Sequence, residues 1–216
     1  MVRMETASVT ASMRRYRGVE PAERLAGRRR RLLVAGLDLL GAQHQDISEL
    51  TVRGICRQAG VAARYFYESF ADKDQFVSAV FDWVVADLAA SIQAAVDAVR
   101  PEQQTRAGMA KIVHTIAGDP RIGRLLFSVH LTNAVLIRKR VESITLFAML
   151  LGRHASNLSG MPPNERSTAA AHFVVGGVGQ TLSAWLAGEV QLKPDELVDQ
   201  LASLLDQLAD PALYHN

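Results

Sequence analysis

The chain has 216 residues, of which 49% are hydrophobic and 21% charged, and this composition fits one large globular domain or two small ones. No apolar run reaches the roughly 18–20 uninterrupted residues that span a bilayer, and residues 1–13 lack the apolar core of a secretory signal. The single cysteine, Cys56, excludes an intramolecular disulfide and a cysteine-based zinc site. We therefore expect a cytoplasmic location, no membrane partner, no metal site, and Cys56 as a small core residue.

The net charge of +2 hides an asymmetry along the chain. Residues 1–71 contain 12 arginines against 7 acidic residues, whereas the remainder contains 12 basic and 15 acidic residues. A basic first third on a mildly acidic remainder is the pattern expected of a nucleic-acid-binding head on a larger body. A basic tail without that function would give the same balance, so charge alone leaves both interpretations open.

The first forty residues divide into an arm and a helix. Residues 1–20 show no sustained periodicity and predict a disordered basic arm. From Pro21 to about Gly41 the apolar residues recur with a period of 3.6, which predicts an amphipathic helix. A polar loop is expected to follow over 43–49.

Two short helices are expected next. Thr51 occupies the N-cap position of the first, and Gly60 ends it, because glycine adopts the left-handed conformation at a helix C-terminus at little cost. The second is expected over about 62–69. Asp72 then caps a longer helix that carries an apolar stripe to about Val99.

The rest of the chain predicts helices alone, since no segment alternates as a strand does. Breaks are expected at Pro101, at 118–120, at 160–163 and at 193–194. The expected helices cover residues 102–117, 120–127, 133–158, 164–188 and 194–209. The sequence therefore predicts an all-α fold of about nine helices.

The stretch 51–70 carries the strongest functional signal. A short helix, a glycine turn and a second short helix leave the second one projecting, and a helix is the right width for the major groove of B-DNA. Small residues permit close approach, Arg64 can bind a guanine edge through two hydrogen bonds, and Tyr67 can reach a phosphate. The candidate DNA-binding residues are Thr51, Arg53, Ala62, Ala63, Arg64, Tyr65, Tyr67 and Lys73.

Residues 51–56 (TVRGIC) and 59–73 (AGVAARYFYESFADK) resemble the DNA-binding signature of the tetracycline-repressor (TetR) family. Segments 31–35 (RLLVA), 184–188 (AWLAG) and 193–197 (KPDEL) also resemble parts of that family. The family usually has a small residue at the place of Arg64, Thr or Ser at that of Tyr65, and His or Tyr at that of Ser69. We therefore expect Arg64 and Tyr65 to set this protein's own DNA specificity.

The resemblance implies a domain organisation and a mechanism. Residues 21–72 are expected to form the helix-turn-helix DNA-binding domain, and 73–216 a larger ligand-binding and dimerisation domain. The protein is expected to be a homodimeric bacterial transcriptional repressor, associated with the nucleoid when it binds a near-palindromic operator in double-stranded DNA. An unknown small-molecule effector would release it by an allosteric change in the separation of the two heads.

Two groups of residues in the larger domain are candidates for these roles. Small residues over 164–188 and a leucine seam from 194 onward predict a four-helix dimer interface, although the same faces would also suit the monomer core. The interface candidates are Ala170, Val174, Gly177, Leu197, Leu201, Leu204 and Leu208. Polar and aromatic residues amid apolar ones mark the ligand pocket, although each also suits the core. The pocket candidates are Trp83, Phe127, His130, Asn133, Phe147 and His172.

Other classes of protein fit the sequence less well. No His-x-x-x-His or Glu-x-x-His pair, nucleophile signature or glycine-rich phosphate loop occurs, so we expect neither an enzyme nor a cofactor. The alternative is a helical dimeric interaction or ligand-binding module whose head binds DNA weakly or only with its ligand, as an activator or co-repressor does. A steep loss of DNA affinity with salt would favour the regulator.

Overall fold

The computed structural model describes residues 21–42, 50–128, 133–160 and 162–208, which form helices and no strands. The predicted arm over 1–20 lies outside these residues. The helices are α1 (Pro21–Leu40), α2 (Val52–Ala59), α3 (Ala63–Tyr67), α4 (Lys73–Asp97), α5 (Pro101–Gly118), α6 (Pro120–Phe127), α7 (Ala134–Ser159), α8 (Glu165–Leu186) and α9 (Pro194–Leu208). The prediction of an all-α fold of about nine helices is confirmed.

The caps of the two helices that flank α3 are those that the sequence predicts. The Thr51 hydroxyl oxygen accepts a hydrogen bond from the Gly54 amide at 3.1 Å and so begins α2. Gly60 ends this helix in the left-handed region, with φ at 63°. The Asp72 carboxylate accepts from the Gln75 amide at 2.8 Å and begins α4. The first backbone amides of a helix have no partner within the helix, and here side chains that are near in sequence accept their hydrogen bonds. Local sequence patterns therefore predict where these helices begin.

The second short helix is shorter than the predicted 62–69. Ala62 is extended and precedes α3, and the helix ends at Tyr67. Beyond it the chain tightens into a turn, in which the amides of Ser69 and Phe70 both donate to the Phe66 carbonyl. This turn carries the Phe70 ring back into the core, where it is 2% exposed.

An aromatic cluster holds the head together. The rings of Phe66, Phe70 and Phe76 pack with centroids 5.2–5.5 Å apart, and they join α3 to the first turn of α4. Gly36 lets α1 cross α4 closely, because a Cβ there would lie 2.7 Å from the Phe76 ring and would also meet Val80. Cys56 is buried in the same core, and burial raises the pKa of its thiol.

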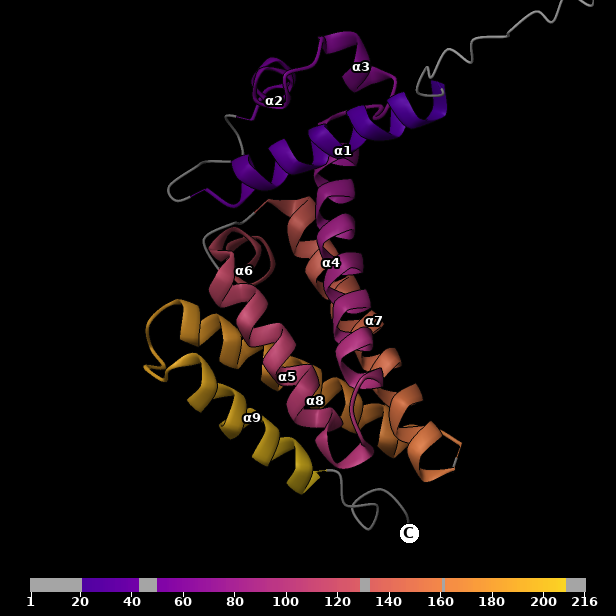
Figure 1. The fold of residues 1–216 in the computed structure, drawn as a ribbon, viewed down its shortest axis with the longest axis vertical. Coiled ribbons are helices and arrows are strands. Elements are labelled where there is room, and N and C mark those ends of the chain that lie inside the picture. The colour runs from indigo at the N-terminus through magenta and orange to yellow at the C-terminus, as the bar shows by residue number, and fades with distance from the viewer. Residues whose placement is uncertain (1–20, 43–49, 129–132, 161, 209–216) are drawn as a thin grey trace, which may run out of the picture.

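Helix α4 runs from the head into the body (Figure 1). By length and composition alone it could cross a membrane, since an 18-residue window of it has a mean hydropathy of 1.5. Its apolar residues are nevertheless used inside the chain, where Val80, Phe81 and Val84 are buried and the helix packs on α1, α5 and α7. Packing within the protein therefore accounts for the apolar residues on the buried face of α4.

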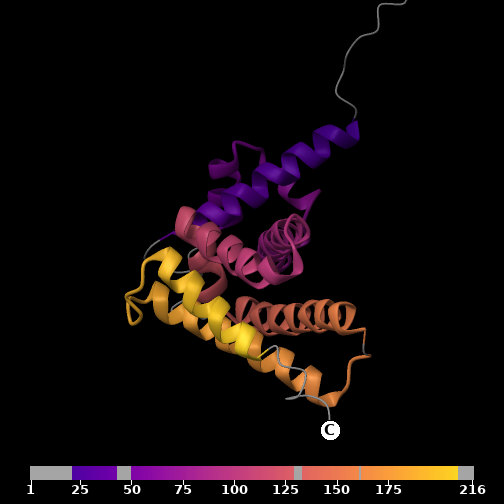
Figure 2. The ribbon, with the colours of Figure 1, turned by 60° about the horizontal axis from the view of Figure 1, so that its bottom comes forward.

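Helices α5 to α9 form the body, in which α5 packs on α9 and α7 on α8. In Figure 2, α8 (orange) and α9 (yellow) lie below α1 (indigo). A second core cluster joins α5, α8 and α9 through Val113, Ile116, Leu182, Leu197, Val198 and Leu201. Leu197 and Leu201, two of the candidates for the dimer interface, are at most 4% exposed, because this seam of α9 packs on α5.

Candidate nucleic-acid interface

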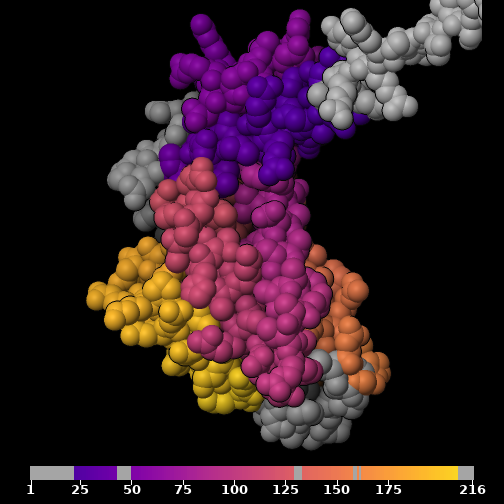
Figure 3. All heavy atoms as spheres, in the orientation of Figure 1, coloured from indigo at the N-terminus to yellow at the C-terminus, as the bar shows by residue number. Residues whose placement is uncertain are grey.

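Helices α2 and α3 lie on the side of α1 that faces away from the body, as Figures 1 and 3 show. Four of the predicted contact residues, Arg53, Ala62, Ala63 and Arg64, are exposed. Tyr67 is 62% exposed, although it follows the fully buried Phe66. This face presents small residues, an arginine and a phenol together, which are suited to close contact with a groove of DNA.

Thr51 and Lys73 are also exposed, and both have structural roles. Thr51 caps α2, as described above, and the Lys73 ammonium donates to the Leu50 carbonyl at 3.0 Å. Lys73 thereby joins the start of α4 to the segment that precedes α2. Both residues lie at helix N-termini, where backbone amides and the helix dipole favour a phosphate.

Tyr65 lies differently from its neighbours. It was expected on the exposed face, but its side chain is half-buried because the Arg28 guanidinium from α1 lies 4.2 Å from the centre of its ring. Arg64 lies over the same ring at 4.7 Å and donates a hydrogen bond of 2.7 Å to the Tyr65 hydroxyl. This hydrogen bond raises the pKa of the Arg64 guanidinium.

A second arginine of α1 also supports α3. Arg29 donates to the Ser69 carbonyl at 2.9 Å, and its guanidinium lies 4.5 Å from the centre of the Phe70 ring. Arg28 in addition lies 3.7 Å from the Glu68 carboxylate. Part of the arginine run in α1 therefore positions α3, while Arg30 and Arg31 remain exposed.

The head meets the body at α6, which lies against α1 (Figure 3). The Arg121 guanidinium forms an ion pair with Asp38 of α1 and another, at 2.6 Å, with Asp119. The hydrogen bonds from Arg121 lower the pKa of Asp119. Arg124 donates to the Gly41 carbonyl, where the chain leaves α1. Two arginines of one short helix thus tie the body to the end of α1.

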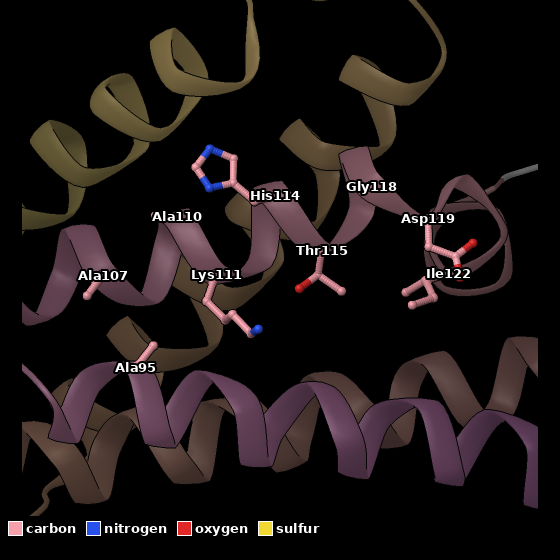
Figure 4. A pocket seen from close by; sticks show the side chains of 9 residues that line it. All are labelled: Ala95, Ala107, Ala110, Lys111, His114, Thr115, Gly118, Asp119 and Ile122. Atoms are coloured by element: carbon pink, nitrogen blue, oxygen red, sulfur yellow. The ribbon is translucent and has the colours of Figure 1, made fainter.

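The body has an open hollow of about 560 Å³ beside this junction (Figure 4). Residues from α4, α5 and the start of α6 line it, namely Ala95, Ala107, Ala110, Lys111, His114, Thr115, Gly118, Asp119 and Ile122. Lys111 points toward α4, whereas His114 points away from it and lies 2.9 Å from the Asp195 carboxylate of α9. A second open hollow of about 580 Å³ lies between α5 and α9.

None of the predicted ligand-pocket residues that the structure describes lines either hollow. Trp83, Phe127 and Phe147 are half-buried and pack against the core that joins head and body. Asn133 caps α7 by accepting from two backbone amides, and His172 is exposed on α8. His130 lies outside the described residues. Core packing and capping therefore account for four of the six predictions.

The five remaining candidates for the dimer interface differ in how exposed they are. Ala170, Val174 and Leu208 are half-buried, while Gly177 and Leu204 are exposed. Phe173, which was not among the candidates, is 71% exposed on α8 between two of them. Two pairings were not predicted either, that of Arg28 with Tyr65 and that of Asp38 with Arg121. Pairs 37 and 83 residues apart leave no local signal in one sequence.

Comparison with known proteins identifies the head. Residues 32–80, which run from the second half of α1 through α2 and α3 to the start of α4, match the family model of bacterial regulatory proteins, tetR family. The head belongs to the tetR family. None of the curated protein sequences compared with the chain matches it. A tetR-family head and the exposed face of α3 together make the protein a DNA-binding regulator.

Solved structures share the fold of this chain over most of its length. A putative TetR-family regulator from Syntrophomonas wolfei is 16% identical, with a TM-score of 0.69 over 85% of this chain and 95% of its own. The fatty acid degradation regulator FadR from Bacillus halodurans is 15% identical, with a TM-score of 0.65 over 92% and 100%. FadR from Bacillus subtilis, solved in complex with stearoyl-CoA, is 16% identical, with a TM-score of 0.64 over 84% and 97%.

Proposed function

We propose that this chain is a homodimeric transcriptional repressor, which binds a near-palindromic operator through α3 and is released by a small-molecule ligand bound in the body. Residues 21–72 then form the DNA-binding domain, and the helices from Lys73 onward the regulatory domain. The observation that carries the proposal is the exposed face of α3, where Arg64 and Tyr67 stand beside two alanines in a tetR-family head. Such a face is suited to reading base edges in the major groove.

A salt titration tests DNA binding without knowledge of the operator. We expect the affinity for a pool of mixed-sequence duplexes to fall linearly with salt on logarithmic axes, by a slope of about −0.9 for each phosphate neutralised. Arg53→Ala should make that slope shallower by about 1. Arg153→Ala removes the same charge from an exposed site on α7 and should leave the slope unchanged. A folded protein without salt-sensitive binding contradicts the proposal.

Exposed apolar residues on α8 and α9 support the dimer. Phe173 and Gly177 on α8 and Leu204 on α9 are exposed, and Phe173 alone is 71% exposed. Aromatic residues are enriched at contacts between protein surfaces. We place the twofold interface on the faces of α8 and α9 that carry these residues, so that each protomer contributes the same residues.

The contacts of α6 with α1 support control by a ligand in the body. Since Arg121 and Arg124 bind the end of α1, a ligand that displaces α6 also displaces the head. Because a structural neighbour binds stearoyl-CoA, that compound is the first probe. We expect it to weaken binding to duplex DNA, while coenzyme A without the acyl chain should not. Equal affinities with and without stearoyl-CoA would exclude this compound as the effector.

A further inference from the structure

Two arginines, Arg28 and Arg64, lie against the ring of Tyr65 on α3. The guanidinium of Arg28 lies 4.2 Å from its ring centre and that of Arg64 lies 4.7 Å from it. Arg28 comes from α1, and its side chain is 23% exposed. Arg64 is exposed on α3. A line of contacts therefore runs from the interior of the head, through the Tyr65 ring, to the arginine that faces DNA.

The hydrogen bond from Arg64 to the Tyr65 hydroxyl restrains the orientation of the Arg64 guanidinium. Its length of 2.7 Å fixes one end of the guanidinium. A guanidinium has five N–H donors in a rigid plane, so one donor on the phenol leaves others for the O6 and N7 atoms of guanine. An exposed arginine loses much side-chain freedom when it binds a base, and a partner that already restrains it reduces that loss.

The surroundings of Tyr65 argue against direct base contact by this residue. Its side chain is half-buried, Arg28 covers its ring, and its hydroxyl already accepts a hydrogen bond from Arg64. Tyr67, two residues further on, is 62% exposed, so its side chain is open to contact with DNA. The two tyrosines of α3 therefore have different environments and, we expect, different roles.

We propose that Tyr65 is a positioning residue for base recognition: it holds the Arg64 guanidinium in the orientation that reads a guanine, and Arg28 holds Tyr65. This inference rests on the proposed function, because it concerns how the same helix selects its DNA sequence. Tyr65 thereby contributes to specificity through Arg64, without touching a base itself.

Tyr65→Phe tests the inference, because it removes the hydroxyl and keeps the ring that packs under Arg28. A duplex is first selected from a random pool, and each base pair is then replaced in turn. We expect Tyr65→Phe to reduce the preference at the guanine read by Arg64 about 3- to 10-fold, the loss typical of one hydrogen bond. Preferences at other positions and the thermal midpoint of unfolding should not change.

Two further variants distinguish positioning from contact. In an Arg64→Ala background, Tyr65→Phe should have no additional effect, since the guanidinium that it positions is gone. Tyr67→Phe deletes the same hydroxyl from the exposed side of α3, and we expect it to weaken all duplexes alike. If Tyr65→Phe costs as much without Arg64 as with it, or if it sharpens the preference for guanine, the inference is wrong.

An NMR measurement on the DNA-free protein separates this inference from the proposed function. Rotation about the Nε–Cζ bond of Arg64 should be slower in the wild type than in Tyr65→Phe, because the hydroxyl restrains the guanidinium. Arg153, exposed on α7, provides the reference for an untethered arginine. Equal rotation of Arg64 in both proteins would overturn the inference even if DNA binding is observed. Slow rotation in a protein that selects no DNA sequence would instead contradict the proposed function alone.

Discussion

Arg64 stands at the exposed tip of α3, and its effect should be specific to sequence. We expect Arg64→Ala to weaken binding to a selected duplex by about 1–3 kcal/mol and to relax the preference at one base pair. The physical reason is the loss of a bidentate hydrogen bond to a base edge. Equilibrium titration of matched and mismatched duplexes measures both effects.

Arg53, another exposed arginine of the head, provides the control for Arg64. Arg53→Ala removes the same charge from the start of α2 and should weaken matched and mismatched duplexes by similar factors. An Arg64→Ala protein with unchanged discrimination would show that another residue reads the base.

Residues whose partners are close in sequence were predictable. Thr51, Gly60 and Asp72 end or begin helices through contacts within four residues, and their structural roles are as the sequence indicates. The environment of Tyr65 was not predictable, because its half-buried state depends on Arg28 of another helix. A single sequence shows which residues alternate between faces, but not which distant side chain covers one of them.

At the scale of elements, α1 and α6 meet through a glycine. A Cβ at Gly41 would lie 2.6–2.8 Å from the Cβ, Cα and carbonyl oxygen of Arg121, so the two helices approach too closely for any side chain there. We expect Gly41→Ala to destabilise the fold by about 1–3 kcal/mol, as overpacking typically does. Chemical denaturation monitored by circular dichroism measures this change.

Gly27 provides the matched control within α1. No atom lies within 4 Å of the position that its Cβ would take, so Gly27→Ala should leave stability unchanged or raise it through the better helix propensity of alanine. Equal effects of the two substitutions would mean that the close contact between Gly41 and Arg121 contributes nothing to stability.

Asp119 begins α6 and pairs with Arg121, and its pKa lies below the ordinary value of 3.8 because Arg121 stabilises the carboxylate. A lowered folded-state pKa adds stability above the unfolded-state pKa, and this stability is lost as the pH falls through the folded-state value. Asparagine caps helices as well as aspartate, so Asp119→Asn removes only the charge. We expect a loss of up to about 1 kcal/mol at pH 7, since the pair is partly exposed.

The pH dependence checks this assignment. The difference in unfolding free energy between wild type and Asp119→Asn should disappear once the pH is well below 3.8. Asp87→Asn, at an exposed position of α4, controls for the change in net charge. A difference that persists at low pH would show that the Asp119 charge is not its source.

The amphipathic pattern of α9 illustrates what periodicity leaves open. It indicates an apolar face that contains Leu197 and Leu201, but either a second chain or a helix of the same chain would cover that face equally well. The structure places α5 there. Since α5 and α9 are more than seventy residues apart in sequence, no local pattern distinguishes the two possibilities.

At the scale of the whole molecule, the proposed dimer depends on Phe173. Because this ring is 71% exposed, Phe173→Glu should leave the protomer folded but prevent the apolar contact between two protomers. We expect monomers in sedimentation equilibrium and weaker DNA binding, since one head alone contacts only half of a palindromic site.

Two substitutions serve as controls, one at another exposed apolar residue and one in the core. Leu25→Glu places the same charge at an apolar residue of α1 that is 43% exposed, and it should leave the dimer intact. Leu201→Glu should unfold the chain, because that leucine is 4% exposed and a buried carboxylate lacks a partner. A Phe173→Glu protein that remains dimeric places the interface elsewhere.

The fold class and the order of the helices were accessible from sequence because they depend on periodicity, caps and breaks. The ligand pocket was harder to predict from the sequence. Trp83 and Phe147 have the composition of pocket residues, yet the structure uses them to pack the core between head and body. Apolar composition is the same for a core and for a ligand site, so only the three-dimensional arrangement separates them.

Selection of bound sequences from a random duplex pool, repeated at low and moderate salt, tests the central claim most directly. We predict enrichment of a near-palindromic site whose half-sites lie one or more helical turns apart, with an affinity that falls steeply as salt rises. A folded dimer that enriches no sequence at either salt concentration would contradict the claim that α3 of this protein reads DNA.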